Sequence, residues 1–339
     1  MVGAGSRGAG RSGGGVVTGL LVRDDLTTLE PPRSKQRLPK PPKPPRRMPK
    51  AVKVLAPMSP QRVAARMATT LVAVVLLGMV VYLTGYSGLA HVIAQDRLNQ
   101  ELRAQLEAGT LPVSEGTFDD VLLLDGAPVA QLQIPQIGVD ETVVEGTTSG
   151  DLEAGPGHRR DTALPGQAGA SVIMGRAAAF GGPFGRLQEL QLGTTFTVVT
   201  GQGKQTFSVI GVRYAGDPAP APITAGKSRL ILETARGPAF LPTGVLRVDA
   251  DLVSPVQPPG ARATLHAGLP PAALELAGDS SRLWALVFAL QALVLVEVGA
   301  VWTYRRIGAR QAWIVFVPLV LLAVLVTADQ TVRLLPNLM

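Results

Sequence analysis

The residues that could do chemistry are few and lie in two short segments. The 339-residue sequence contains no cysteine, which excludes disulfides, thiolate metal ligands and a cysteine nucleophile. The remaining candidate nucleophiles are Thr234, which follows Glu233, and Ser171. A hydroxyl needs an adjacent base, and neighbours in a strand point to opposite faces. Glu233 is therefore poorly placed to activate Thr234.

The other segment is a Gly-rich loop. The apolar run 171–174 breaks at Gly175, and residues 175–190 read GRAAAFGGPFGRLQEL. A strand that runs into such a loop is a common place for binding and catalytic residues. Its first charged residue is Arg176, and a guanidinium cannot shuttle a proton near neutral pH.

Metal and cofactor sites are not indicated. The three histidines are His91, His158 and His266, and no pair has the spacing of metal ligands. We therefore expect no metal and no cofactor.

Short apolar runs separated by Gly, Pro and Asp turns must position these residues. Many short strands with turn signals indicate an all-β barrel or sandwich. One helical turn is expected near 184–190. The predicted strands cover residues 129–134, 171–174, 195–200, 206–215, 229–234 and 245–252.

Three apolar segments predict transmembrane α-helices, at 67–86, 283–304 and 311–328. About 20 helical residues, at about 1.5 Å each, cross a hydrocarbon core about 30 Å thick. The only charged residue within them is Glu297. An acid inside a span indicates a functional site by default, and we interpret Glu297 as a contact with a partner subunit.

Basic residues at the ends of the spans predict the orientation. By the positive-inside rule their ends are cytoplasmic, so segment 87–282 and the tail 329–339 lie outside the cytoplasm of a multi-pass plasma-membrane protein. A leader of 66 residues is too long for a cleaved signal peptide, which favours an uncleaved signal anchor. The flanking residues are Lys53, Arg62 and Arg66 before the first span, and Arg305, Arg306 and Arg310 in the loop 305–310.

The N-terminal segment 1–66 holds 14 Lys/Arg against 3 Asp/Glu and is rich in proline. Such a composition predicts a disordered cytoplasmic tail. The tail either only enforces topology or also binds anionic lipid or an acidic partner. Segment 87–282 holds 14 Lys/Arg against 20 Asp/Glu, so the basic charge of the chain does not indicate nucleic-acid binding.

Two linkers bound the predicted folded domain at 127–253. Residues 87–126 begin with a helical stripe of leucines, Leu98, Leu102 and Leu106, that Gly109 ends. Residues 254–282 are Pro-rich and lead back to the membrane.

The segment from Ile134 to Val199 resembles the extracellular domain of sortases, particularly the actinobacterial, class E-like type. The resemblance extends over about 129–252 and implies the sortase β-barrel. The ordered landmarks that carry it are Ile134-Pro135 with Ile137-Gly138, Val144-Glu145-Gly146, Gly155-Pro156-Gly157-His158, Ala163-Leu164-Pro165-Gly166, and Pro183-Phe184 with Leu187 and Leu190.

The resemblance also implies where chemistry would occur. Sortases are cysteine transpeptidases that use a histidine for proton transfer and an arginine for the oxyanion. Their histidine position is Arg176 here, their Thr-Cys-Thr is Thr234-Ala235-Arg236, and their arginine position is Val245, with Arg247 two residues out of register. His158 matches an early landmark and is interpreted as structural.

From these substitutions we predict a degenerate sortase-like protein that is not an enzyme and that acts as a binding or scaffolding subunit of a cell-envelope complex. Two alternatives remain: a transport or signalling accessory subunit working through its helices, and a transpeptidase or hydrolase with a non-cysteine nucleophile. The partner would be an envelope or membrane protein.

Three arginines are candidates for binding a partner at the substituted site: Arg176, Arg236 and Arg247. Guanidinium groups grip carboxylate or phosphate with two hydrogen bonds. The alternative is that each pairs with a local acid such as Glu233 or Asp249.

Overall fold

The computed structural model describes residues 59–117 and 121–339. The predicted disordered tail lies outside these residues, apart from its last eight positions. Four α-helices are present: α1 (Pro60–Val81), α2 (Ser87–Ala108), α3 (Leu283–Arg306) and α4 (Ala309–Leu334). A π-helical turn, Tyr82–Tyr86, joins α1 to α2 without a break. Gly109 ends α2 in the left-handed conformation, with φ 66°, as its position after the leucine stripe predicts.

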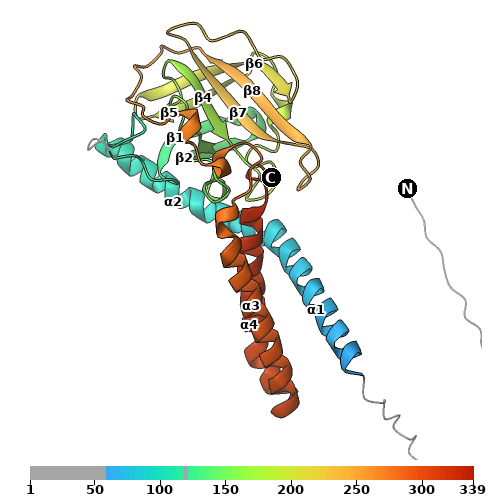
Figure 1. Ribbon diagram of the computed structural model, residues 1–339. Coiled ribbons are helices and arrows are strands. Elements are labelled where there is room, and N and C mark those ends of the chain that lie inside the picture. The colour runs from blue at the N-terminus through green and yellow to red at the C-terminus, as the bar shows by residue number, and fades with distance from the viewer. Residues whose placement is uncertain (1–58, 118–120) are drawn as a thin grey trace, which may run out of the picture. The chain divides into compact units, whose positions relative to one another are not determined.

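Eight strands form a closed barrel in the order β1-β2-β3-β4-β7-β8-β6-β5 (Figure 1). Most neighbours are antiparallel, but β4 runs parallel to β7 and β2 to β3. Closure leaves no long free edge. The strands are β1 Pro128–Ile134, β2 Val139–Glu145, β3 Gly157–His158, β4 Gly169–Met174, β5 Thr195–Thr200, β6 Gly203–Tyr214, β7 Ser228–Arg236 and β8 Gly244–Leu252.

The barrel interior is a single apolar core. Alternate residues of each strand point inward, and fully buried leucine, isoleucine, valine and phenylalanine side chains fill it. The rings of Phe196 and Phe207, on β5 and β6, stack with centroids 5.8 Å apart. The predicted fold class, an all-β barrel with three helices that could cross a membrane, is confirmed.

Two strands were missed and one helical turn is shorter than expected. In β2, Asp140 and Glu141 interrupt the apolar run, and β3 has only two residues. The helical turn near 184–190 is a 3₁₀ turn, Leu187–Glu189. Further 3₁₀ turns lie at Pro135–Ile137, Asp151–Glu153, His266–Gly268, Pro271–Ala273 and Ser280–Arg282.

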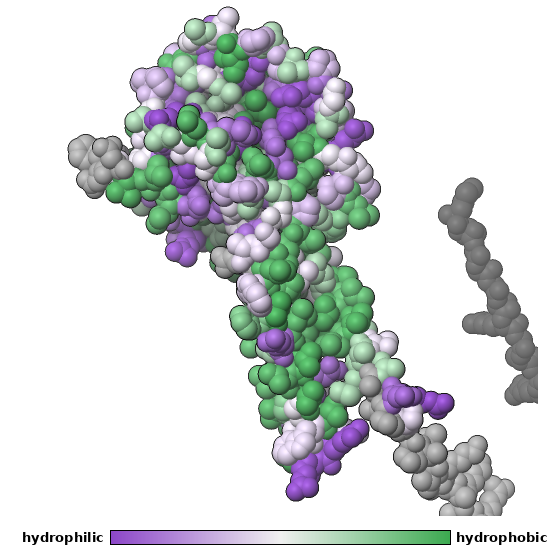
Figure 2. Space-filling view, viewed as in Figure 1, coloured by the Kyte–Doolittle hydropathy of each residue, from purple (hydrophilic) through white to green (hydrophobic). Residues whose placement is uncertain are grey.

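Three helical stretches in the described residues are long and apolar enough to cross a membrane. They are the continuous helix Ala65–Ala108, α3 and α4. Figure 2 shows that the surface of these helices is mainly apolar, whereas the barrel surface mixes polar and apolar residues. Arg333 of α4 pairs with Glu153 of the barrel domain at 3.2 Å, and Tyr82 of the π-helical turn donates to Asp329 of α4 at 2.7 Å.

Candidate functional site

The three substituted catalytic positions, Arg176, Ala235 and Val245, meet together with Thr234 at one end of the barrel, where β4, β7 and β8 lie side by side. Residue 175 donates its N–H to Glu233 O at 2.9 Å, which places Arg176 next to the end of β7. Ala235 pairs directly with Val245 across the β7–β8 ladder. Gly175 is required for this packing, because a Cβ there would lie 2.5 Å from the ring of Phe184. We call this region the barrel-end site.

The pleat of the strands separates Thr234 from its neighbours. Leu232 and Leu246 point into the core, so Thr234 also points inward, and its hydroxyl donates to Gly175 O at 2.8 Å. Glu233, Ala235 and Val245 point outward. The predicted separation of Glu233 from Thr234 is therefore observed, and Ala235 is the β7 residue that faces the site.

Arg176 is almost completely buried, with 1% of its surface exposed. Its guanidinium donates to Ser149 O at 2.7 Å, to Ser149 Oγ at 2.9 Å and to Leu152 O at 3.2 Å. It also lies over the ring of Phe180, 4.9 Å from the centroid. Burial lowers the pKa of Arg176 to about 10, against the opposing effect of Glu153. The arginine ties the β4 loop to the loop that precedes β3.

The barrel-end site is covered by the segment Leu335–Met339, which follows α4. Ala177 donates its N–H to Leu338 O at 2.9 Å, and Arg176 donates to Met339 O at 3.4 Å. The Leu338 side chain is fully buried and belongs to a small cluster on the outer barrel face. The other members of the cluster are Leu152, Val172, Met174 and Val245, with Ala235 packed against it.

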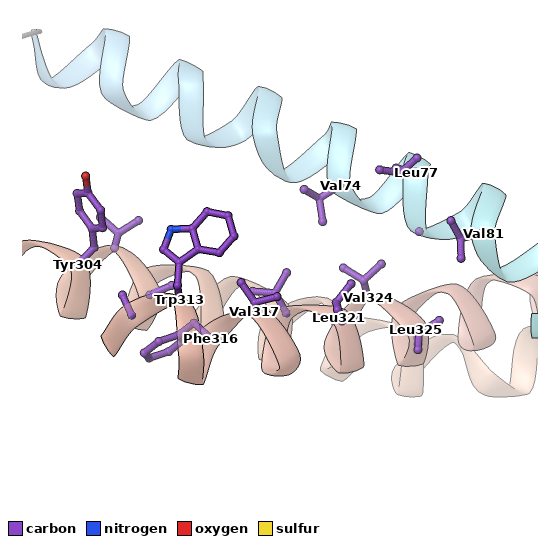
Figure 3. Close-up of a pocket in the computed structure, with 15 residues that line it drawn as sticks. Val74, Leu77, Val81, Tyr304, Trp313, Phe316, Val317, Leu321, Val324 and Leu325 are labelled. Atoms are coloured by element: carbon purple, nitrogen blue, oxygen red, sulfur yellow. The ribbon is translucent and has the colours of Figure 1, made fainter. Parts of the chain in front are cut away.

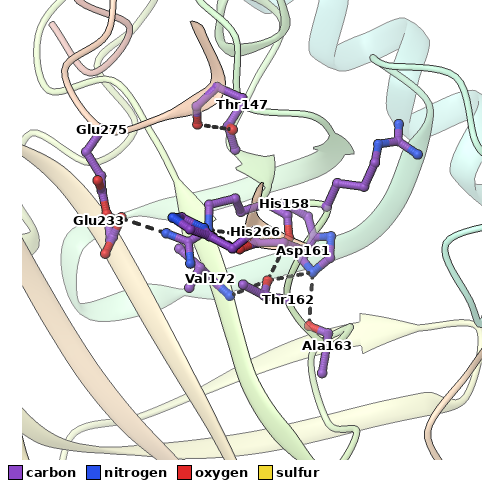
Figure 4. A network of polar contacts seen from close by, with 12 residues as sticks. Thr147, His158, Asp161, Thr162, Ala163, Val172, Glu233, His266 and Glu275 are labelled. Atoms are coloured by element: carbon purple, nitrogen blue, oxygen red, sulfur yellow. Dashed lines mark hydrogen bonds and ion pairs between the residues drawn. The ribbon is translucent and has the colours of Figure 1, made fainter. Parts of the chain in front are cut away.

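An ion-pair network crosses the outer face beside this site (Figure 4). Arg247 donates to Glu233 at 2.6 Å and to Glu275 at 3.1 Å. Burial raises the pKa of Glu233, the charge of Glu275 adds to the increase, and Arg247 opposes it. The network continues through Arg159 to Asp161. Glu275 belongs to the linker after β8, so the network fastens that linker to the barrel.

His158 is buried in a separate part of this network (Figure 4). Its Nδ1 lies 3.0 Å from Glu145 Oε2, and its Nε2 lies 2.9 Å from Ala163 O. Both ring nitrogens of His158 are therefore engaged in contacts with buried oxygens. With both nitrogens occupied, His158 holds β3 in place and offers no free base to the barrel-end site.

The three candidate binding arginines do not share one anion site. Arg176 is bonded to carbonyl oxygens, and Arg247 already contacts two carboxylates. Arg236 is exposed and lies over the ring of Tyr214, 4.2 Å from the centroid. Their binding of an external anion stays a prediction, as does the intramembrane role of Glu297, which lies partly exposed on α3.

A cavity of about 660 Å³ lies between α1, α3 and α4 (Figure 3). Its lining is almost entirely apolar, and Tyr304 and Trp313 lie near one end. Apart from the Tyr304 hydroxyl and the Trp313 indole N–H, such a lining offers only hydrocarbon contact. Within the described residues no cluster of three or more His, Asp or Glu could hold a metal ion.

Comparison with known proteins adds a family to this geometry. Residues 132–237 match the family model described as Sortase domain. Sortase D of Bacillus subtilis (strain 168) is 31% identical over 105 residues, which are 30% of this chain and 52% of that protein. The chain therefore spans about half the length of this relative.

Solved structures give a weaker likeness. A Sortase D5 transpeptidase from Clostridium perfringens matches with a TM-score of 0.37 and 17% identity, over 49% of this chain and 99% of that one. Sortase E1 from Streptomyces coelicolor, solved with a tripeptide in its active site, matches with a TM-score of 0.34 and 23% identity, over 44% and 98%. At these scores the likeness carries no argument about function.

The prediction that the protein is not an enzyme is wrong. The matched domain is that of a family of transpeptidase enzymes, and the relative from Bacillus subtilis is itself a sortase. Arg176, Ala235 and Val245 at the family's catalytic positions exclude a thiolate mechanism, because the sequence has no cysteine. They do not exclude a mechanism with another nucleophile, so these substitutions do not establish that the protein lacks activity.

Proposed function

We propose, on the premise that residues 132–237 are a sortase-family domain, that this envelope protein recognises a polypeptide partner at its barrel-end site. It would act as a binding subunit of a complex in the cell envelope. The observation that carries the proposal is the environment of Leu338. Its side chain is completely buried in an apolar pocket, and beside that pocket lies a main-chain donor, the N–H of Ala177.

That pairing of groups suits a polypeptide better than a small ion. The N–H of Ala177 binds any peptide carbonyl, and the pocket adds selectivity for an apolar side chain. The positive charge of Arg176 is already shared among neighbouring oxygens. The site therefore has a peptide-like donor and an apolar surface close together.

A crosslinking experiment tests this proposal. A photoreactive residue at Ala178, which is partly exposed beside the site, should form an intermolecular adduct in native membranes. Ala235→Trp fills the outer face and should reduce the adduct at least tenfold. Ile210→Trp, on a partly exposed strand position of β6, is the matched control and should leave it unchanged. An adduct that persists in Ala235→Trp would refute recognition at this site.

We also propose that the barrel lies outside the cytoplasm and that the α3–α4 turn lies inside, with the first helix acting as a signal anchor. The basic flanks of the spans support this orientation. Cysteine introduced at Leu192 and, separately, at Ile307 reports it, because both side chains are more than half exposed. A membrane-impermeant thiol reagent should label Leu192→Cys and not Ile307→Cys in intact cells. The reverse pattern would show that the protein has the opposite orientation and would refute this proposal.

The second candidate function is enzymatic, and the family match favours it. Transfer or hydrolysis of a peptide would then use an oxygen nucleophile, and Thr234 is the hydroxyl nearest to the family's nucleophile position. The test is turnover of a peptide partner by the purified full chain. Thr234→Val, which keeps the shape and removes the hydroxyl, should abolish turnover; unchanged turnover would exclude Thr234 as the nucleophile.

A further inference from the structure

We infer that residues Leu335–Met339 are an internal ligand of the barrel-end site, and that a partner peptide must displace them by presenting a carboxamide followed by a branched apolar side chain. The inference rests on the proposed function. It adds the chemistry of the ligand and the regulation of the same site.

The Asn337 subsite selects a hydrogen-bond donor. The side-chain Nδ2 donates to Thr147 O at 2.8 Å and to Leu274 O at 2.9 Å. The backbone N–H donates to Ala277 O at 2.9 Å, and no part of Asn337 is exposed. Because both side-chain partners are carbonyl oxygens, a carboxylate at this position would face two acceptors and lose both bonds.

The Leu338 subsite selects an apolar side chain. The pocket is formed by Leu152, Val172, Met174 and Val245, which lie on three different segments of the barrel. The backbone carbonyl oxygen of Leu338 accepts a hydrogen bond from the Ala177 N–H. Met339 N–H bonds to Pro336 O at 3.2 Å, so the segment forms a turn that presents Asn337 and Leu338 together. The turn is the feature that a partner must reproduce.

Two features make the segment a displaceable ligand rather than part of the core. It lies on the outer barrel face and contributes no residue to the core cluster inside the barrel. Asn337 Oδ1 is buried without a hydrogen-bond partner among the described residues, which weakens its fit because a buried acceptor loses its water. A partner that satisfies this oxygen would bind better than the internal segment does.

The attachment of the segment Leu335–Met339 to α4 allows it to compete with a partner peptide for the barrel-end site. Arg333, in the last turn of α4, pairs with Glu153, and Asp329 accepts from Tyr82. These bonds hold the segment beside its site, and a tethered ligand acts at an effective concentration in the millimolar range for short connections. A free peptide of the same sequence should therefore bind only after the segment has been released.

The test measures binding of a fluorescent, acetylated Leu-Leu-Pro-Asn-Leu-Met peptide to the full-length protein in detergent. Deletion of residues 335–339 and, separately, Leu338→Asp should each tighten binding at least tenfold relative to the unaltered chain. A peptide with Asp in place of Asn should bind at least tenfold more weakly to both variants. Thermal unfolding of each variant reports whether the barrel is intact.

Three outcomes would overturn the inference: equal binding to all three proteins, no binding to either folded variant, or unfolding of both variants. The last would show that the segment is a structural part of the barrel. The crosslink from Ala178 separates this inference from the proposed function. If the crosslink is sensitive to Ala235→Trp and does not increase on deletion of 335–339, the proposed function stands and the internal-ligand inference fails.

Discussion

The barrel-end site and the cavity between α1, α3 and α4 are both lined by apolar side chains, but different groups fill them. At the barrel end the chain supplies the cover itself, with Leu338 fully buried and its backbone hydrogen-bonded. The cavity between α1 and α4 has about 660 Å³ and an almost purely apolar lining. Lipid chains can fill such a space without specific contacts.

This difference between the barrel-end site and the cavity indicates which of the two can select a specific partner. A surface that combines a pocket with directed donors and acceptors distinguishes one partner from another. A purely apolar groove in a hydrocarbon environment gains little from any one partner, because lipid is as apolar as the groove. Recognition is therefore expected at the barrel end, and packing tolerance in the membrane. The following variants break or sharpen this contrast.

The largest effect is expected for Arg176→Met. The variant leaves Ser149 O and Leu152 O buried without their donor, and the free energy of unfolding should fall by about 3–5 kcal/mol. Arg186→Met is the matched control, because its ion pair with Glu189 is exposed; it should leave the free energy of unfolding nearly unchanged. Denaturant unfolding in detergent measures both. Equal effects would mean that the buried bonds of Arg176 contribute nothing.

The next pair compares the same substitution in the two regions. Leu232→Ala empties a fully buried position on β7 and should destabilise the protein by about 3 kcal/mol. Leu321→Ala removes a cavity-lining side chain that is 59% exposed and should cost less than about 1 kcal/mol, because lipid or detergent replaces the lost contacts. Similar losses at both positions would show that the cavity is packed as tightly as the barrel.

Much of this contrast can be predicted from the sequence. The three long apolar helices follow from the length of the apolar runs, and six of the eight strands follow from alternation and turn signals. Strand β2 was missed because Asp140 and Glu141 break the apolar run; Asp140 is exposed, and Glu141 pairs with His91 of α2. Strand β3 is too short to carry any periodic signal, and only its pairing with β2 and β4 defines it.

The positions that form the barrel-end site can be predicted from the sequence, but the segment Leu335–Met339 that covers the site cannot. The resemblance places Arg176, Ala235 and Val245 together, and the β4–β7–β8 pairing brings them there. No local sequence pattern predicts the contact between Leu338 and Ala177, because tertiary packing brings these two distant segments together. The available signal was Pro336, two residues after the last residue of α4 and followed by a polar and an apolar residue, which marks a turn.

Gly78→Ala tests the one close contact within the cavity wall. A Cβ at this position of α1 would lie 1.9 Å from Val324 Cγ1 of α4, so the helices must separate, at a cost of about 2 kcal/mol. Gly88→Ala is the control, because no atom lies within 4 Å of a Cβ there; it should be neutral or slightly stabilising. The thermal unfolding midpoint distinguishes them. A harmless Gly78→Ala would show that α1 packs loosely along its whole length.

The smallest effect is a pH dependence in the loop beneath Leu338. Burial raises the pKa of Asp151 from 3.8 to about 6, while hydrogen bonds from Thr148 oppose the increase. Because the folded-state pKa is higher, the folded protein binds this proton more tightly than the unfolded chain does. The associated stability is complete below about pH 4 and is lost as the pH rises through about 6.

Asp151→Asn keeps an acceptor for Thr148 and removes the titration. We expect the variant to lose the fall in stability between about pH 4 and pH 6, and to exceed the unaltered chain by about 1 kcal/mol at pH 7, a value reduced for partial solvent exposure. Unfolding free energies at pH 4, 5, 6 and 7 measure this, with Asp140→Asn on the exposed side of β2 as the control. Parallel pH profiles for Asp151→Asn and the unaltered chain would show that the carboxyl is solvated, and that the loop holding Leu152 against Leu338 is more open than its hydrogen bonds indicate.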